Sequence, residues 1–513
     1  MFQKKWALPV ALATVIGVST VSSVGLEGQA KVPATKTVNY KTALSNSTAY
    51  YYSKNLQATY ATPDLVTNLA RSSYGVNKSF YTNYYKDVAK KLVNQKGILT
   101  ESAGSIAKTI IAINAIGKNP TNVGGYNLLD ILADKLVANS QTESGIGISN
   151  AIYTLIALEG DNAQFSTKEN YMAVSSKSLA DYLISTQFEN GGFSWDANVP
   201  DGVSVDMTAM VLTALANLDE YPTVKAAIRK GLDYMASNLS ATAGYEPWGA
   251  NSADTQAQVI LALTENGMNP KTARAFIKNG EWAISNLLLN YDATNHSFKM
   301  MPTDKVANAY TTSSGILALV AYDRYATDHT TYYDVADVKA SSLAYDTTPP
   351  KTIKLSAVTN AAKKLTGTAE AYAKVVISQD SKKLSTTQTD VTGKFSYTIP
   401  TALKAASTVK VTVTDLAGNQ SKVFTYKVKD VLTPAKPKVS KVVAGAKIVY
   451  GTATKGATVT VKATGKSYKT TANPKTGKYS VKVTAVKKGA KITVFSKKDG
   501  YTSKLTTVTV KAK

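Results

Sequence analysis

One helical phrase recurs along the middle of this chain and constrains its fold more than any single residue does. Residues 102–120 (SAGSIAKTIIAINAIGKNP) and 252–270 (SADTQAQVILALTENGMNP) are equal in length, begin with small residues and end in Asn-Pro. Looser copies start at Gly145, Gly202 and Asn308. A helix pair that cannot bury its apolar face alone stacks on its neighbours, so repeats spaced by about 40–60 residues predict one continuous all-α body. Such a body is either a closed toroid or an open solenoid.

The first thirty residues have the pattern of an export signal. Lys4 and Lys5 precede the apolar stretch 6–24, and the small residues around Ala30 suit a cleavage site. This order predicts a secretory signal peptide over residues 1–30. Polar residues within the stretch disfavour a membrane anchor, and no later segment is apolar enough to span a bilayer. We therefore expect an exported protein with no transmembrane segment in the mature chain.

The chain has no cysteine. That excludes disulfides, thiolate zinc sites, cysteine nucleophiles and thioesters together. The C-terminus is a strand-like run that ends at Lys513, without a wall-sorting motif or a hydrophobic tail. We therefore expect non-covalent retention at a Gram-positive-type envelope, or release from it.

Composition divides the chain into five parts. Residues 31–61 are rich in Thr, Ser, Tyr and Asn and are interpreted as a spacer, and helical patterning predicts a toroid domain over residues 62–345. Two prolines in Asp346–Pro350 indicate a hinge, after which the apolar period changes from 3.6 to 2. Residues 346–430 and 431–513 then repeat each other, with Thr-Gly-Lys-Phe-Ser in the first and Thr-Gly-Lys-Tyr-Ser in the second. These two modules resemble the bacterial Ig-like domains of surface proteins. The predicted fold class is multidomain: an all-α toroid followed by two all-β Ig-like sandwiches.

Charge is distributed very unevenly between these parts. The net charge of the chain is +24, yet residues 431–513 hold 19 lysines and one acidic residue, Asp499, which makes this module +18. The first module is +7, which leaves −1 for residues 1–345. A cationic tail attracts polyanions through screened electrostatics, and for an exported protein we expect anionic wall polymers as its partner. Nucleic acid is not expected, because no aromatic stacking platform or recognition helix accompanies the lysines.

The segment Gln187-Phe-Glu-Asn-Gly-Gly-Phe-Ser-Trp195 begins with a glutamine and ends in aromatic residues, and helical segments at 205–215, 257–263 and 318–325 accompany it. On these segments, residues 180–325 resemble the secreted branch of the terpenoid cyclase and prenyltransferase α/α-toroid superfamily, and the first segment is similar to its QW repeat. The resemblance implies inner and outer helices joined by glycine-rich turns. Zinc-dependent and thioester-bearing relatives are excluded by the absence of cysteine.

Two aspartates are the candidates for residual catalysis. The superfamily's cyclases use an Asp-x-Asp-Asp-Thr-Ala motif, and this chain has Ser204-Val-Asp-Met-Thr-Ala209 in its place. Asp206 therefore lacks the flanking carboxylates that would keep it a strong acid. Asp254 occupies the same position in another repeat, which favours a structural role as a helix N-cap for both. We expect no catalytic residue, and name Asp206 and Asp254 as the alternative.

Four aromatic residues are the predicted ligand contacts. Loops around residues 190–202 and 244–251 carry Phe193, Trp195, Tyr245 and Trp248 beside glycines, which makes flat contacts for sugars, corrins or peptides. The alternative is that Phe193 and Trp195 pack as the aromatic end of a QW repeat. No metal and no cofactor is expected, because each of the two histidines stands without a ligand-spaced partner.

These patterns together predict an exported surface or wall-associated protein. In this reading a non-catalytic toroid binds an unknown ligand or partner protein, and the basic Ig-like modules serve as a stalk and retain the protein at the wall. Two alternatives stay open. One is a secreted toroid enzyme, either terpene-cyclase-like or carbohydrate-active, and the other is a carrier of a small ligand that resembles cobalamin carriers.

Overall fold

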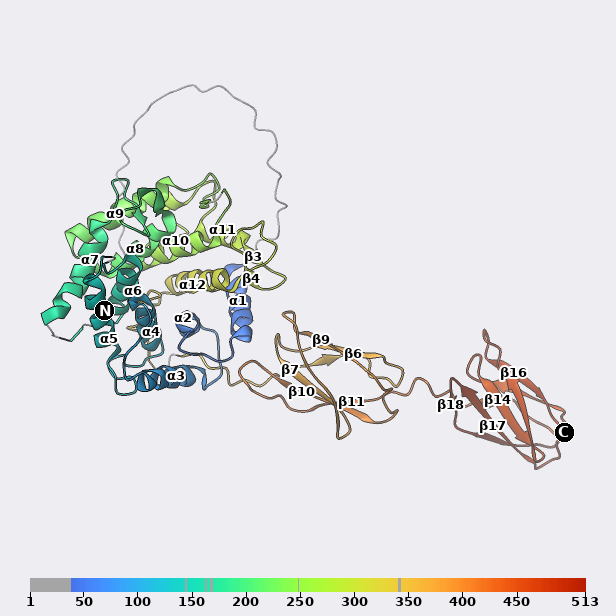
Figure 1. Cartoon of the computed structure of the whole chain (residues 1–513). Coiled ribbons are helices and arrows are strands. Elements are labelled where there is room, and N and C mark those ends of the chain that lie inside the picture. Colours follow the sequence, from blue (N-terminus) through green and yellow to red (C-terminus); the bar gives the residue numbers. More distant parts are fainter. Residues whose placement is uncertain are drawn as a thin grey trace, which may run out of the picture. The chain divides into compact units, whose positions relative to one another are not determined.

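A computed structural model describes residues 38–513, except positions 144, 162, 164, 167–168, 248 and 340–342. The expected signal peptide lies outside these residues. The N-terminal part is helical (Figure 1), with helices α1 (Tyr40–Lys54), α2 (Pro63–Arg71), α3 (Phe80–Asn94), α4 (Ala103–Ala115), α5 (Leu128–Ser140), α6 (Ile148–Glu159), α7 (Ser176–Ser185), α8 (Val205–Leu215), α9 (Pro222–Ser237), α10 (Ala253–Glu265), α11 (Ala283–Leu289) and α12 (Ala309–Ala326). Short 3-10 segments follow at Glu169–Val174, Pro200–Gly202, Ala216–Leu218 and Arg274–Phe276.

The even-numbered helices form a closed ring. Helix α2 packs on α4, α4 on α6, α6 on α8, α8 on α10 and α10 on α12, and α12 returns to α2. The helices α4, α6, α8, α10 and α12 begin within the recurrent phrase that the sequence repeats. Closure between the last helix and the first decides between the two repeat architectures, so the body is an α/α toroid and not an open solenoid.

The odd-numbered helices lie outside this ring. Helices α5, α7, α9 and α11 each contact the inner helix that precedes them, and α1 contacts α12 and α11. Helix α3 joins the same core through side chains such as Val88 and Leu92, both fully buried. Each outer helix therefore covers the apolar flank of its inner neighbours, which a single helix pair would leave in water.

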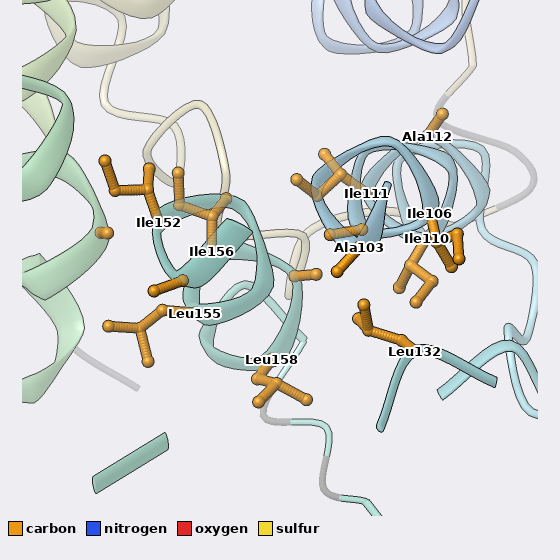
Figure 2. Packing of buried hydrophobic residues seen from close by; sticks show 14 of the residues in the cluster. Ala103, Ile106, Ile110, Ile111, Ala112, Leu132, Ile152, Leu155, Ile156 and Leu158 are labelled. Atoms are coloured by element: carbon orange, nitrogen blue, oxygen red, sulfur yellow. The ribbon is translucent and has the colours of Figure 1, made fainter. Parts of the chain in front are cut away.

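The core is built mainly from aliphatic side chains of the inner helices. Figure 2 shows part of it, where Ile106 and Ile110 of α4 lie beside Leu132 of α5, and Ile152 and Leu155 belong to α6. All five are at most 1% exposed. Alanines such as Ala103 of α4 and Ala257 of α10 occupy inner positions without exposure, which lets neighbouring helices approach closely.

The expected spacer over residues 31–61 was wrong for residues 40–54. Tyr40–Lys54 form helix α1, which Asn39 caps by accepting a hydrogen bond from the Lys41 amide at 2.8 Å. Its buried side chains are mostly small or polar, namely Ala43, Leu44, Ser47, Thr48 and Tyr52. Such a composition carries no apolar stripe, so its periodicity could not reveal the helix.

Polar side chains hold the seam where the ring closes. Asn68 of α2 is buried, and its Nδ2 donates to the backbone oxygen of Ser313 in α12 at 3.2 Å. Its Oδ1 accepts from the Tyr332 hydroxyl at 2.7 Å. On the outer side of α12, the Tyr40 hydroxyl donates to Asp323 at 3.1 Å. The first and last inner helices are thus joined by directional bonds in addition to apolar packing.

A buried ion pair network lies at the other end of this seam. Arg71, the last residue of α2, is 3% exposed and donates to Asp337 at 2.9 Å, while Arg324 of α12 reaches the other oxygen of Asp337 at 2.5 Å. The remaining Arg71 donors bind the backbone oxygens of Tyr332, Thr331 and Asp334 and the hydroxyl of Thr330. Arg71 therefore fixes the segment that follows α12 across the ring.

Each C-terminal module is a sandwich of two antiparallel sheets. The first contains β5 (Lys354–Leu355), β6 (Lys364–Thr368), β7 (Lys374–Gln379), β8 (Lys382–Gln388), β9 (Lys394–Thr398), β10 (Thr408–Thr414) and β11 (Phe424–Lys427). The second contains β12 (Lys438–Val439), β13 (Ile448–Thr452), β14 (Thr458–Ala463), β15 (Lys466–Thr471), β16 (Lys478–Lys482), β17 (Lys491–Lys498), β18 (Tyr501–Thr502) and β19 (Thr506–Thr509). The helical part also holds two short hairpins, β1 (Phe193–Ser194) with β2 (Val203–Ser204), and β3 (Tyr291–Asp292) with β4 (Ser297–Phe298).

The two modules share one strand order. A three-stranded sheet runs β5-β6-β9 in the first module and β12-β13-β16 in the second. The facing sheet runs β8-β7-β10-β11 in the first and β15-β14-β17 with β19 in the second. In both modules a strand glycine lies opposite an aromatic residue, Gly367 with Phe395 and Gly451 with Tyr479. A Cβ on Gly367 would lie 2.6 Å from the Phe395 ring, so glycine is required there.

Residue contacts divide the chain into two compact units. One holds the chain up to Thr348 together with Leu416–Asn419, and the other holds Pro349–Asp415 and Gln420–Lys513. Among the described residues, none of the helices combines the length and the apolar character that crossing a bilayer needs.

Candidate functional site

A cavity of about 230 Å³ lies inside the ring. Residues from all six inner helices line it, together with Tyr51 of α1 and Tyr333 of the segment after α12. A cavity of this kind is a natural place for a ligand, because several helices supply side chains to one concave surface.

The lining follows the sequence repeat. The sixth residue of α4, α6, α8, α10 and α12 is in each case a lining residue: Lys108, Tyr153, Met210, Gln258 and Ser314. In four of these helices the ninth residue lines the cavity as well, namely Ile156, Thr213, Leu261 and Leu317. Positions i and i+3 share one face of a helix, so every repeat turns the same face inward. The sixth residues differ in chemistry from repeat to repeat, which distinguishes this layer from the alanine-rich packing around it.

The charged part of the cavity is a cluster of Asp64, Lys108 and Tyr153. The Lys108 Nζ lies 3.1 Å from Asp64 Oδ2 and 4.4 Å from the centre of the Tyr153 ring. Burial lowers the pKa of Lys108, but Tyr153 and Asp64 together raise it above its ordinary value. Burial raises the pKa of Tyr153. At neutral pH Lys108 is therefore an ammonium group and Tyr153 a neutral phenol.

Tyrosine dominates the rest of the lining. Tyr51, Tyr153, Tyr310 and Tyr333 each contribute, and Tyr310 is 73% exposed at the rim. Burial raises the pKa of Tyr51 and that of Tyr333, so both phenols stay neutral. A neutral tyrosine offers an apolar ring face and a hydroxyl that both donates and accepts. Four of them around one small cavity suit a ligand with an apolar ring edge and several hydroxyls.

Asp206 and Asp254 lie in the first turn of α8 and α10, but neither caps its helix. The caps are Ser204, which accepts from the Met207 amide, and Ser252, which accepts from the Thr255 amide at 3.3 Å. The expected N-cap role of the aspartates was therefore wrong. Each occupies the second helical position, where the positive end of the helix dipole stabilises a carboxylate.

Asp254 has a defined hydrogen-bonding environment. Its Oδ2 accepts from the Thr311 hydroxyl of α12 at 2.8 Å. Burial raises its pKa and Asp206 raises it further, while the hydroxyls of Ser314 and Thr311 oppose that rise. The side chain thus bridges α10 and α12 beside Tyr310. It does not line the cavity.

The four aromatic residues expected to contact a ligand do not form one surface. Phe193 has no exposure and Tyr245 is 2% exposed, so both belong to the core, and the prediction that they contact a ligand was wrong. Trp195 is 61% exposed on the loop after β1, and it does not line the cavity. Trp248 lies outside the described residues.

Phe193 instead repeats a packing arrangement. Its amide donates to the Thr208 hydroxyl at 2.9 Å, and the Phe298 amide donates to the Thr312 hydroxyl at 3.1 Å. Each threonine is the fourth residue of the inner helix that follows. The QW-like segment therefore ties a hairpin to the next helix through Phe193. The packing alternative holds for Phe193, whereas the exposed Trp195 does not pack as that alternative expected.

The described residues contain no group of three His, Cys, Asp or Glu side chains placed to hold a metal ion. His296 stacks on Tyr291 with ring centres 6.5 Å apart. The side chains that line the cavity supply phenols, an ammonium group, a carboxyl group, an amide and hydroxyls.

Sequence reasoning missed the cavity residues, although a signal for them was present. Aligned on their shared Ser-Ala start, the phrases at 102 and 252 place Lys108 opposite Gln258, a charged residue opposite an amide. Long polar side chains at the same position of two repeats indicate a lined opening rather than core packing.

The basic module offers a second surface. In residues 431–513 all the lysines are exposed except Lys498, which is half-buried, and in this fully described module no lysine lies within ion-pair distance of a carboxylate. Its positive charge is therefore directed to solvent.

Comparison with known proteins identifies the C-terminal modules. The family model described as "Bacterial Ig domain" matches residues 349–430 and again residues 433–512. The chain thus ends in two bacterial Ig domains. No curated protein matches the chain.

Several solved structures match parts of the chain at low identity. UGL with dGlcA-Glc-Rha-Glc is 11% identical over 58% of this chain and 99% of that one, with a TM-score of 0.42. Haptocorrin in complex with Cbi is 10% identical over 76% and 97%, with a TM-score of 0.40. The BSP domain of a biofilm-associated protein is 20% identical over 31% of this chain and 30% of that chain, with a TM-score of 0.16. The ligands in those titles belong to those proteins and are not assigned to this chain.

Proposed function

We propose that this is an exported surface protein whose helical toroid binds a ligand at the cavity in its mouth and whose two Ig domains form a basic stalk. The observation that carries the binding role is the repeated inward position, at which five inner helices each supply a different side chain to one cavity. Core packing alone does not require an ammonium group, an amide and a phenol at equivalent places.

The ligand chemistry follows from the lining. A volume of about 230 Å³ lies below the range of about 300–1,000 Å³ that drug-sized ligands occupy. Tyrosine rings, Gln258, Ser314 and Lys108 supply apolar faces and polar donors around it. We propose a ligand with one or two sugar-sized rings, such as the end of a glycan. A corrin with its nucleotide is much larger than this cavity, so cobalamin is not proposed.

The stalk role rests on the two Ig domains and their charge. Their cationic surface, +18 in the second domain, favours retention by anionic wall polymers of a Gram-positive-type envelope without a covalent bond. Retention of this kind weakens with salt, because the screening length falls to about 3 Å at 1 M. Washing cells in 1 M salt should release the protein, and retention after the wash would contradict this part of the proposal.

The binding role is tested by screening the full chain against neutral and acidic saccharides with native mass spectrometry and thermal shift. For a saccharide that binds, Tyr310→Ala should weaken affinity about tenfold, as expected for loss of an aromatic contact of about 1.4 kcal/mol. Tyr310 is exposed, so its truncation leaves the core intact. Trp195→Ala is the matched control, since it removes an exposed aromatic outside the cavity. If Trp195→Ala weakened saccharide affinity and Tyr310→Ala did not, the binding site would lie on the loop after β1 instead.

One observation favours a second candidate, a secreted hydrolase or lyase. Burial and, to a smaller extent, Asp206 raise the pKa of Asp254, which lies beside Tyr310, and a raised pKa is how a carboxyl group is prepared to donate a proton. Asp254→Asn distinguishes the two functions, because it keeps the shape and can still accept from Thr311. Loss of saccharide cleavage with unchanged melting would favour the enzyme, whereas unchanged binding without any cleavage favours the binding protein.

A further inference from the structure

One face of the last Ig domain combines lysines with exposed apolar rings. The three-stranded sheet β12-β13-β16 turns Lys438, Ile448, Tyr450, Lys478, Ser480 and Lys482 outward, and we call this surface the basic sheet face. Tyr450 is 54% exposed and Ile448 is 45% exposed. The alternate residues Val449, Tyr479 and Val481 point into the sandwich core.

Strand register fixes how these side chains are arranged. Tyr450 pairs with Ser480, so Lys478 and Lys482 lie two residues to either side of its partner. Lys438 and Lys478 both pair with Thr452 and so flank it across the sheet. Standard strand geometry then places Lys438 about 10 Å from Lys478, and Lys478 about 14 Å from Lys482. Tyr450 therefore lies on the same sheet face as all three lysines, within two residues of register from each.

The equivalent face of the first Ig domain shows which of these residues are particular to the second domain. There Lys354 and Lys394 correspond to Lys438 and Lys478 by strand register. The position of Tyr450, however, is held by a threonine that pairs with Ser396, and the position of Lys482 is held by Thr398. The position of Ile448 is held by Lys364, which is exposed and pairs with Thr398. Both faces therefore carry three lysines, and only the exposed tyrosine ring is particular to the second domain.

We infer that the basic sheet face is a binding site for an acidic polysaccharide, whose pyranose rings stack on Tyr450 while its anionic groups contact Lys438, Lys478 and Lys482. This rests on the proposed retention by polyanions and narrows it to one surface and one polymer class. Charge complementarity identifies an anionic occupant, because no carboxylate in this domain neutralises these lysines. The exposed tyrosine favours a polymer with rings, since a ring edge is what an aromatic face packs against.

The test compares two triple variants of the full chain that lower the charge of the domain equally, from +18 to +15. The first carries Lys438→Gln, Lys478→Gln and Lys482→Gln. The control carries Lys469→Gln, Lys491→Gln and Lys497→Gln, which remove exposed lysines from the facing sheet. Binding to immobilised heparin is measured at low salt. Each lysine that contacts the polyanion should contribute about fivefold, so the first variant should lose about 100-fold in affinity and the control less than about fivefold.

A single variant tests the polymer class. Tyr450→Thr installs the residue that the first Ig domain has at this position, so the strand should fold normally. It should weaken heparin binding about five- to tenfold and leave binding to inorganic polyphosphate unchanged.

The outcomes separate this inference from the proposed function. Equal losses in both triple variants would overturn the basic sheet face and leave diffuse electrostatic retention standing. Equal effects of Tyr450→Thr on heparin and polyphosphate would overturn the choice of a polysaccharide. Absence of heparin and polyphosphate binding by the unaltered chain at low salt would overturn both the inference and the retention on which it rests.

Discussion

Arg71→Ala should destabilise the toroid more than any surface substitution in it. The guanidinium of Arg71 makes an ion pair with Asp337 at 2.9 Å and donates to three backbone oxygens in the segment after α12. Truncation removes these bonds and leaves the buried oxygens without their donor. It also breaks the link between the last turn of α2 and the segment that follows the final inner helix, which is where the ring closes.

The magnitude follows from burial. Arg71 is 3% exposed, and removing one partner of a buried ion pair costs about 3–5 kcal/mol, because the groups left behind lose their compensation. Arg324 still pairs with Asp337 at 2.5 Å, so the carboxylate keeps one cation and the lower half of that range is expected. For a domain of this size about 1 kcal/mol shifts the melting temperature by about 2 °C, so we expect a decrease of about 6–8 °C.

Differential scanning calorimetry of the full chain measures this shift. The Ig domains share no residue with the network, so their transition serves as an internal reference. Arg229→Ala, which removes an exposed arginine from α9, is the matched control and should change the toroid transition by less than about 1 °C. A toroid transition of Arg71→Ala within 2 °C of the unaltered protein would refute the claim that this network holds the ring closed.

Three further perturbations test other parts of the fold. Burial raises the pKa of Glu265 to about 7, so the folded state binds this proton more tightly than the unfolded chain does. The free energy of unfolding should therefore fall by about 3 kcal/mol as pH rises from about 4.5 to 7. Glu265→Gln should abolish this pH dependence in urea titrations at several pH values. Gly315→Ala would place a Cβ 2.5 Å from the buried ring of Phe298, and should therefore lower the toroid melting temperature despite the better helix propensity of alanine. Asn290→Ala removes donors to the oxygens of Asn251 and Met300 at 3.2 and 2.8 Å, and should cost about 2–3 kcal/mol in chemical denaturation, whereas no loss would show that water replaces the amide.

Most of the fold could be predicted from the sequence, because the fold is built from repeats. The phrase shared by residues 102–120 and 252–270 predicted stacked helix pairs, and the second module copied the strand pattern of the first. Closure of the ring could not be predicted, since it depends on side chains such as Asn68 and Arg71 that meet their partners more than 240 residues away. Helix α1 was not predicted, because its buried residues are mostly small or polar and form no apolar stripe.

The candidate site was harder to predict than the fold. Aromatic residues beside glycines pointed to Phe193 and Tyr245, but an aromatic ring in a loop serves the core as readily as a ligand, and both are buried. The lining residues Lys108 and Gln258 lay in the recurrent phrase itself. Periodicity assigns a residue to a face of a helix, yet it cannot say whether that face meets a neighbouring helix or an open cavity.

A crystal structure of the full chain with the tightest-binding saccharide from the screen tests the central claim most directly. We predict that the sugar ring lies in the cavity between Tyr310 and Tyr153, with a polar contact to Lys108. A saccharide bound at the Trp195 loop, or at any other surface while the cavity holds only water, would contradict the account.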